Sequence, residues 1–278
     1  MHFAKLHGLG NDFVLVDLRG APAGAWSPDA AWAARVCDRH RGIGADGVLA
    51  LLDALPSENA PGGSTLCARL VIHNSDGSRP EMCGNGARCA ALWIATDGCT
   101  RPARSEVLLL TDAGPRLCRV EAIDSLSAQV EVDMGPPRVE PARAVECDGL
   151  EEQMTPVSMG NPHRVIFPVA ADAADLAELC AGSGPKLCAV EGANIEFARA
   201  VGHQRFVATV WERGAGATQA CGTGACAVAA AAIARGLAKA DEVIVVELPG
   251  GTLCLRMDGD SMKMRGEAVL VFHGELAP

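Results

Sequence analysis

The chain has 278 residues, of which 49% are hydrophobic and 21% charged, a composition typical of folded proteins rather than disordered ones. Its formal net charge of −10 gives no attraction to nucleic-acid phosphates, so we expect no nucleic-acid partner. The N-terminus has no basic segment followed by an apolar core and a cleavage site, and the longest apolar run, residues 225–234, is too short to span a bilayer. We therefore expect a cytoplasmic protein without a membrane partner.

Twelve cysteines are many for this length. Without an export signal we expect reduced thiols rather than a disulfide framework. No C-x-x-C pair occurs, which removes the commonest zinc and dithiol-redox signatures, and we expect no metal. Most of the cysteines have apolar neighbours and are expected to be small core residues: Cys37, Cys67, Cys99, Cys118, Cys147, Cys180, Cys188 and Cys254.

Short runs bounded by Gly, Pro, Asn or Asp predict strands in the first half of the chain, over residues 13–16, 48–52, 68–72, 106–110 and 128–132. Residues 29–38 predict a helix, with Ser27 and Pro28 as its cap and first turn. The second half predicts a helix over 172–180 and strands over 194–198, 206–211, 243–248, 252–257 and 269–273. Pro136 and Pro137 are a natural place for two domains to separate.

Two pairs of segments repeat along the chain. Gly10-Asn11 and Gly160-Asn161 each precede an apolar run, at an offset of 150 residues. The segments 83–87 (CGNGA) and 221–225 (CGTGA) each run into an alanine-rich helix, at an offset of 138 residues. Repetition at about half the chain length predicts two similar domains from an internal duplication. Many strands with one central helix per domain indicate the α+β class.

The repeated cysteines, Cys83 and Cys221, each precede Gly-x-Gly at a predicted helix start. The first turn of a helix presents unpaired N–H groups and a positive dipole end, which hold a carboxylate and lower the pKa of a cysteine. Inverting an α-carbon needs a base on one face and an acid on the other, and a thiolate and a thiol supply both. The pattern therefore predicts an amino-acid epimerase in which Cys83 and Cys221 exchange the α-proton.

Other interpretations compete with this one. A single such cysteine would as readily be a packed residue at a helix start, but two near-copies make that interpretation weaker. Cys89 and Cys226 lie inside the predicted helices, and we assign them to the core. Residues 42–47 match G-x-G-x-x-G, but they follow a helix and precede a strand, the wrong order for a dinucleotide site. A thiol-redox or metal-binding protein that uses Cys83 and Cys221 is the alternative from another class, and a non-catalytic binding protein is the weakest.

Seven segments in order resemble the diaminopimelate epimerase family: residues 7–13, 38–47, 74–78, 81–89, 159–163, 212–216 and 221–226. The resemblance implies two domains of strands wrapped around a central helix, 1–126 joined by 267–278, and 127–266, with the active site in the cleft between them. It implies interconversion of LL- and meso-diaminopimelate for lysine and cell-wall precursors, without pyridoxal phosphate or metal, in a homodimer. A relative on the same fold that racemises another amino acid, such as histidine, is the closest alternative.

The resemblance also implies roles for individual residues. Cys83 and Cys221 are the acid/base pair, and His163 and Glu212 adjust the acidity of the two thiols. The remaining residues are expected to bind the substrate: Asn11, Asn74, Gly84, Asn85, Asn161, Asn194, Glu212, Arg213, Gly222 and Thr223. Gly47 stands where some members of the family have a glutamine that contacts substrate, so we expect that contact to be missing.

Overall fold

The computed structural model describes residues 1–22, 26–54, 66–96, 104–147, 149–169 and 173–276. The chain divides into two compact units, Met1–Val132 with Gly266–Pro278, and Asp133–Arg265. The chain passes from the first unit to the second within strand β7 (Ser127–Gly135) and returns within strand β17 (Ser261–Glu275). In the part of the chain that the structure describes, no helix is long and apolar enough to cross a membrane.

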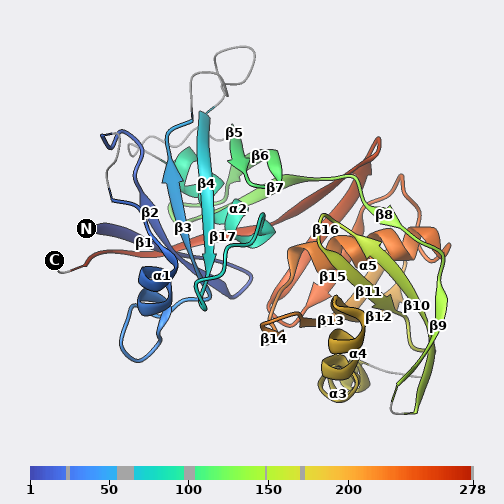
Figure 1. Cartoon of the computed structure of the whole chain (residues 1–278). Helices are drawn as coiled ribbons and strands as arrows, with labels where there is room; N and C mark the ends of the chain where they lie inside the picture. The colour runs from blue at the N-terminus through green and yellow to red at the C-terminus, as the bar shows by residue number, and fades with distance from the viewer. Residues whose placement is uncertain (23–25, 55–65, 97–103, 148, 170–172, 277–278) are drawn as a thin grey trace. The chain divides into compact units, whose positions relative to one another are not determined.

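The first unit consists of strands around a central helix, α2 (Gly84–Ala95), as Figure 1 shows. The helix contacts six strands: β1 (His2–Gly8), β2 (Asn11–Asp17), β3 (Gly47–Leu52), β4 (Leu66–Asn74), β5 (Arg104–Thr111) and β6 (Gly114–Ala122). Strand pairing is antiparallel between β1 and β2 and parallel between β2 and β3. Almost every residue of α2 is buried, as expected of a helix enclosed on all sides.

Helix α1 (Ala30–Cys37) lies on the outer side of the first unit. Alternation along the strands decides which side chains meet which helix. Val14 and Val48 pack with α1, whereas Leu49, one residue further along β3, faces Gly86 of α2. The predicted cap of α1 was wrong: Asp29, rather than Ser27 and Pro28, accepts a hydrogen bond from the backbone N–H of Trp32 at 2.7 Å. A side-chain carboxylate satisfies an N–H that the first turn leaves unpaired.

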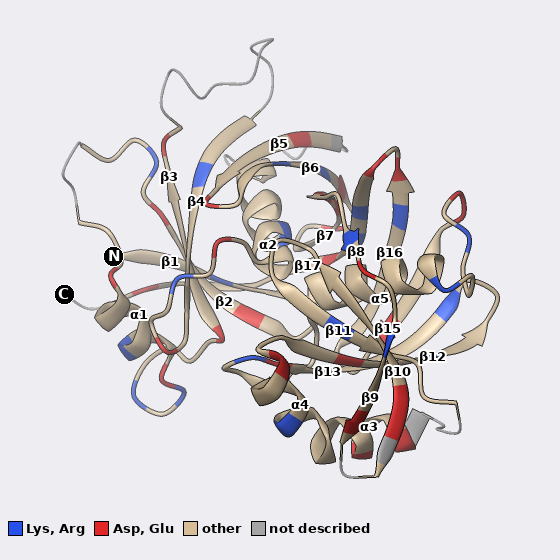
Figure 2. Ribbon diagram, turned by 45° about the vertical axis from the view of Figure 1, so that its right-hand side comes forward, with Lys and Arg blue, Asp and Glu red and all other residues tan. Residues whose placement is uncertain are grey.

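The second unit repeats this plan around α5 (Gly222–Ala234), which carries no charged residue (Figure 2). Seven strands contact α5: β8 (Arg138–Val139), β10 (Leu150–Ser158), β11 (Pro162–Ile166), β12 (Asn194–Gly202), β13 (Arg205–Glu212), β15 (Ile244–Leu248) and β16 (Gly251–Asp258). Strand β9 (Arg143–Cys147) pairs with β10, and β14 (Gly216–Ala217) pairs with β13.

Helices α3 (Ala173–Gly182) and α4 (Gly184–Glu191) pack on β12 and β13. Their apolar cluster includes Ile195 and Phe197 of β12 and Leu187 of α4. Since successive side chains of a strand point to opposite faces, the residues between them face the other way, toward α5. One face of strand β12 therefore packs in this apolar cluster, and its other face points toward the central helix α5.

The α+β class and a helix wrapped by strands in each half are confirmed, and the predicted strands lie within observed ones, except that β15 begins at Ile244, one residue after the predicted start at Val243. The helix predicted over 172–180 corresponds to α3, Ala173–Gly182; residue 172 lies outside the described part of the chain. Sequence reasoning missed several elements, among them β1, β6, β9, β10 and α4.

Candidate active site

Cys83 is the N-cap residue of α2, in an extended conformation with φ −137° and ψ 117°. Its carbonyl accepts the first helical hydrogen bond, from the backbone N–H of Ala87 at 2.8 Å. The N–H groups of the first turn, which begins with Gly84 and Asn85, have no intrahelical carbonyl to bind. A Cβ on Gly86 would lie 2.9 Å from a methyl carbon of Leu49. The sequence therefore places a half-buried thiol beside the N–H groups of the first turn, at the positive end of a helix.

Two further candidate residues meet at this helix start. The side-chain NH₂ of Asn85 donates to the side-chain oxygen of Asn11 at 3.2 Å, and the NH₂ of Asn11 donates to Asp46 at 3.0 Å. The fully buried Arg88 donates to the side-chain oxygen of Asn85 at 2.9 Å. Each amide is therefore held with a fixed orientation. Asn74 lies at the end of β4, opposite Gly47, and donates to the hydroxyl of Ser78 at 2.9 Å.

The side-chain amide of Asn11 binds a charged cluster that sequence reasoning did not identify; its members are Lys5, Asp12, Arg39 and Asp46. Arg39 donates to Asp12 at 2.7 Å and to Asp46 at 2.8 Å, and the ammonium of Lys5 lies 2.5 Å from Asp12. Burial acts to raise the pKa of Asp12, but hydrogen bonds from Arg39 and Lys5 outweigh it and lower the pKa to about 2. The cluster therefore fixes the turn that carries Asn11.

Gly47 has no room for a side chain. A Cβ at this position would lie 2.6 Å from the backbone oxygen of His73, closer than van der Waals contact allows. The strand pairing of β3 with β4 thus requires glycine here. A longer side chain such as glutamine could not occupy this position unless the backbone moved.

In the second unit, Cys221 is the N-cap residue of α5. Its sulfur accepts a hydrogen bond from the backbone N–H of Gly224 at 3.4 Å and lies 3.5 Å from the hydroxyl of Thr223. The thiol group is buried. Cys221 has the same N-cap position as Cys83 in the first unit, with Gly222 and Thr223 where the first unit has Gly84 and Asn85. Unlike that of Cys221, the side chain of Cys83 makes no capping hydrogen bond.

Strand register places the other candidates of this unit on one face of the sheet. His163 of β11 lies opposite Asn194 of β12, and Glu212 follows Trp211, which lies opposite Ile195. With alternating side chains, His163, Asn194 and Glu212 therefore point to the same side, toward α5. Asn161, at the turn before β11, donates to Thr223 at 3.3 Å and lies 3.0 Å from the ring of His163.

Glu212 lies against the thiol of Cys221. Its carboxyl accepts a hydrogen bond from the hydroxyl of Thr218 at 2.5 Å, and a hydrogen bond also links it to Cys221. Burial raises the pKa of Glu212 above its usual value, against the effect of these hydrogen bonds. The structure thus brings Glu212 to the thiol that it was expected to influence.

The pKa of Cys221 is raised well above its usual value, contrary to the lowering that we expected at a helix start. Burial is the largest cause, followed by the negative charges of Glu212 and Glu196. Hydrogen bonds from Thr223 and from the backbone N–H of Gly224 act in the opposite direction but are outweighed. Cys221 is therefore a neutral thiol around neutral pH.

Arg213 is exposed, and its backbone N–H donates to the side-chain oxygen of Asn194 at 2.9 Å. Its guanidinium donates to the carbonyl of Gly192, at the C-terminal end of α4, at 3.1 Å. The side chain is thus anchored at its base and lies at the surface. The guanidinium of Arg213 is a planar donor group of the kind that binds carboxylates.

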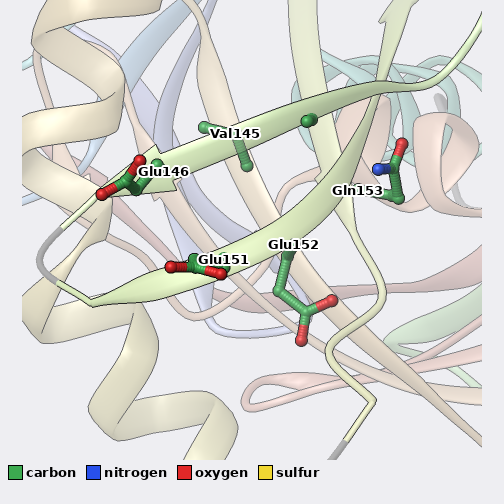
Figure 3. Close-up of a pocket in the computed structure, with 6 residues that line it drawn as sticks. Val145, Glu146, Glu151, Glu152 and Gln153 are labelled. Carbon is green, nitrogen blue, oxygen red and sulfur yellow. The ribbon is translucent and has the colours of Figure 1, made fainter.

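A hollow between β9 and β10 is lined by Ala144, Val145, Glu146, Glu151, Glu152 and Gln153 (Figure 3). None of the candidate site residues lines it, and its carboxylates come from neighbouring positions of one hairpin. Within the described ranges, no group of three or more His, Cys, Asp and Glu side chains could hold a metal ion.

The family model named Diaminopimelate epimerase matches residues 3–140 and 155–271 of the chain. The chain belongs to the diaminopimelate epimerase family. A relative named diaminopimelate epimerase from Xanthomonas axonopodis pv. citri is 38% identical over 291 residues, covering 99% of this chain and 96% of the relative. Another, from Synechococcus elongatus, is 41% identical over 302 residues, covering 99% and 98%.

Solved structures with the same fold come from more distant proteins. A probable proline racemase from Agrobacterium radiobacter K84 superposes with a TM-score of 0.74 at 17% identity, covering 99% of this chain and 92% of that one. A hydroxyproline epimerase from Agrobacterium vitis gives 0.69 at 17% identity, covering 99% and 91%. At this identity the likeness shows that the fold of diaminopimelate epimerases is shared with these proteins, and no more.

Sequence reasoning missed one buried carboxylate, that of Glu196, which lies beside the candidate residue His163. Glu196 of β12 is 1% exposed, and its carboxylate lies 2.6 Å from a ring nitrogen of His163. The signal was present in the sequence, since a glutamate stands between Ile195 and Phe197 in a run predicted to be a buried strand. A charged residue on the inner side of a strand needs a partner, and His163 is that partner.

Proposed function

We propose that this chain interconverts LL- and meso-2,6-diaminopimelate, with Cys83 and Cys221 as a thiol/thiolate pair that acts on opposite faces of one α-carbon. The thiolate removes the α-proton, the thiol delivers a proton to the other face, and the two exchange roles in the reverse direction. Membership of the diaminopimelate epimerase family supports the substrate and the reaction class, an isomerisation.

The observation that carries the residue assignment is the repeated helix start. In each unit, one cysteine is the N-cap of the enclosed central helix and a glycine follows it directly. The N–H groups at the start of each helix, which no helical carbonyl accepts, suit the negative charge that develops on the substrate carboxylate when the α-proton leaves. Each unit thus supplies one thiol and one set of donors.

Other residues receive roles from their contacts within one unit. The carboxylate of the reacting centre is held by Gly84, Asn85, Gly222 and Thr223, with Asn11 and Asn161 nearby. Glu212 and His163 adjust the acidity of the thiols. The amino-acid end of the substrate away from the reacting carbon is bound by the remaining candidates, Asn74, Asn194, Glu212 and Arg213.

We further propose an N-terminal epimerase domain, 1–126 with 267–278, and a C-terminal one, 127–266, in a cytoplasmic homodimer that needs no cofactor. The racemase of another amino acid is the less supported alternative. The curated relatives named diaminopimelate epimerase are 38–41% identical, whereas the racemase and epimerase structures of other amino acids are 17% identical.

A substrate comparison tests the proposal. The purified protein is incubated separately with LL-diaminopimelate, L-histidine and L-proline, and the stereoisomers are separated by chiral chromatography. We expect the meso isomer from diaminopimelate and no D-amino acid from the other two. Racemisation of histidine or proline without conversion of diaminopimelate would contradict the proposal.

A further inference from the structure

Glu196, the buried partner of His163, has no role in the reaction as described so far. Glu196 Oε1 lies 2.6 Å from His163 Nδ1, and the two side chains are 2% and 0% exposed. The other carboxylate oxygen, Oε2, has no hydrogen-bond partner among the described residues. Burying an ionised carboxylate is costly unless a charge or several hydrogen bonds compensate for it, so this carboxylate depends on His163.

The second ring nitrogen of His163 is also engaged. Nε2 lies 3.0 Å from the side-chain oxygen of Asn161. Since that oxygen only accepts hydrogen bonds, Nε2 carries a proton. Nδ1 faces Glu196 Oε1, and a carboxylate oxygen accepts hydrogen bonds, so Nδ1 is the donor in this contact.

Helix α5 favours the same charge distribution. A Cβ on Gly224, in the first turn of α5, would lie 2.9 Å from Glu196 Oε1. The absence of a side chain at Gly224 therefore lets the carboxylate approach the start of the helix. The positive end of the helix dipole stabilises a negative charge at this place. Glu196 Oε1 thus lies between the start of α5 and the ring of His163.

The hydrogen bonds from His163 lead to the thiol. With the oxygen of Asn161 occupied by the ring, its NH₂ group donates to Thr223 Oγ1 at 3.3 Å. The hydroxyl oxygen of Thr223 is then an acceptor for Asn161, which leaves the hydroxyl proton to point to Cys221 Sγ, 3.5 Å away. A hydroxyl that donates to sulfur stabilises the thiolate. The direction of every hydrogen bond in this series follows from the proton on Nε2.

We propose that Glu196 is a positioning residue that keeps both ring nitrogens of His163 protonated, and that this fixes the direction of the hydrogen bonds from His163 through Asn161 and Thr223 to Cys221. The inference rests on the proposed function, because it assigns Cys221 to the reaction. Glu196 itself touches neither the thiol nor the substrate in this role, and no proton passes through the amide of Asn161.

Several other titratable groups influence the pair or are influenced by it, and they belong to every element packed against it. They are Glu212 of β13, Cys221 at the start of α5, Cys180 of α3 and Cys188 of α4. Burial raises the pKa of all four. The three cysteines are therefore neutral around neutral pH, and Glu196 is the carboxylate in direct contact with the ring of His163.

The test compares the wild-type protein with Glu196→Gln, using protein labelled with ¹⁵N in the histidine rings. We expect the wild type to show both ring nitrogens of His163 protonated at about neutral pH, and the variant to show one. We expect kcat on diaminopimelate to fall about tenfold or more in the variant, a part of the ~10² to 10⁴ that positioned acid/base groups supply. KM should change little, since Glu196 does not contact substrate.

Glu191→Gln is the matched control. Glu191 lies outside the proposed site. It accepts a hydrogen bond at 2.8 Å from Arg164, the residue that follows His163 in the sequence. The Glu191→Gln variant should leave both the ¹⁵N spectrum of the His163 ring and kcat unchanged. Glu196→Asp, which keeps the charge, should retain both ring protons and recover part of the rate.

Three results would overturn the inference: a singly protonated His163 in the wild type, unchanged ring nitrogens in Glu196→Gln, or wild-type turnover by that variant. The wild-type spectrum decides the point even if Glu196→Gln does not fold. If the wild type fails to convert diaminopimelate, the proposed function fails, while the spectrum still tests the protonation of the pair.

Discussion

The side-chain amide of Asn85 donates a hydrogen bond to the side-chain oxygen of Asn11 at 3.2 Å. These residues are 74 positions apart and come from the first turn of α2 and the start of β2. Asp46 and Arg88 hold the other ends of the two amides. The pair is thus oriented before any substrate binds, which reduces the entropy lost on binding.

Replacement of Asn11 by alanine should raise KM for diaminopimelate and lower kcat/KM about fivefold, because one oriented hydrogen bond is worth roughly 1 kcal/mol. Steady-state kinetics on the purified variant measures this change. Thr111→Ala is the control, since it removes a side-chain hydrogen bond to Gly114 in a hairpin of the same unit. Equal kinetic effects of the two variants would remove Asn11 from the binding site.

Cys83→Ala and Cys221→Ala should each reduce turnover by ~10² to 10⁴, the contribution of a positioned acid or base. Cys89→Ala and Cys226→Ala provide matched controls, because both side chains are buried within the same two helices. The controls should lose some stability through packing but keep the chemistry. Wild-type activity in either Cys83→Ala or Cys221→Ala would contradict the two-base mechanism.

Much of this arrangement follows from local sequence patterns. The segments CGNGA and CGTGA each place a cysteine directly before a helix of small residues, and the structure makes both cysteines N-caps. Strands such as β3 and β12 were predictable because apolar runs there end at glycine, asparagine or a charged residue. Capping of α1 was mispredicted because Ser27, Pro28 and Asp29 are all plausible starts, and Asp29 alone makes the bond to Trp32.

The raised pKa of Cys221 could not be predicted in the same way. A helix start lowers the pKa of an exposed thiol, but here burial and two carboxylates outweigh the helix. Glu212 precedes Cys221 by nine residues, whereas Glu196 reaches the site only through the register of β12 with β11 and β13. Long-range strand pairing determines such contacts, and one sequence does not display that pairing.

Replacement of Glu212 by glutamine should lower the pKa of Cys221. Burial is the main cause of the raised pKa, and the negative charge of Glu212 is the next, so its removal makes the thiolate easier to form. The rate of iodoacetamide alkylation at Cys221, followed by peptide mass spectrometry, should then rise at lower pH than in the wild type. Glu247→Gln is the control, since Glu247 pairs with Arg205 outside the site. A shift of the alkylation profile to higher pH would contradict the assignment.

Asp12→Asn should lower the free energy of unfolding at about pH 7. Burial favours the neutral acid, but hydrogen bonds from Arg39 and Lys5 outweigh it and lower the pKa of Asp12 from 3.8 to about 2 in the folded state. The stabilisation is therefore complete above the unfolded value of 3.8 and is lost as pH falls through about 2. We expect a loss of about 1 to 2 kcal/mol, reduced by solvent screening of the exposed Arg39.

Urea unfolding at a series of pH values measures this loss. The difference between the wild type and Asp12→Asn should stay constant down to about pH 4 and shrink below it. Asp258→Asn removes an exposed carboxylate 3.8 Å from Arg256 and should change stability little. A difference between wild type and Asp12→Asn that grows on acidification would reverse the sign of the proposed linkage.

The most direct test of the central claim is the fate of the α-proton. The wild-type protein is incubated with LL-diaminopimelate in deuterated water, and product and recovered substrate are analysed by mass spectrometry at early times. Two thiols acting from opposite faces should place one solvent deuterium in the meso product and almost none in the recovered substrate, because the acid that delivers the proton differs from the base that removed it. Meso product formed without deuterium, or equal labelling of substrate and product at early times, would contradict the account.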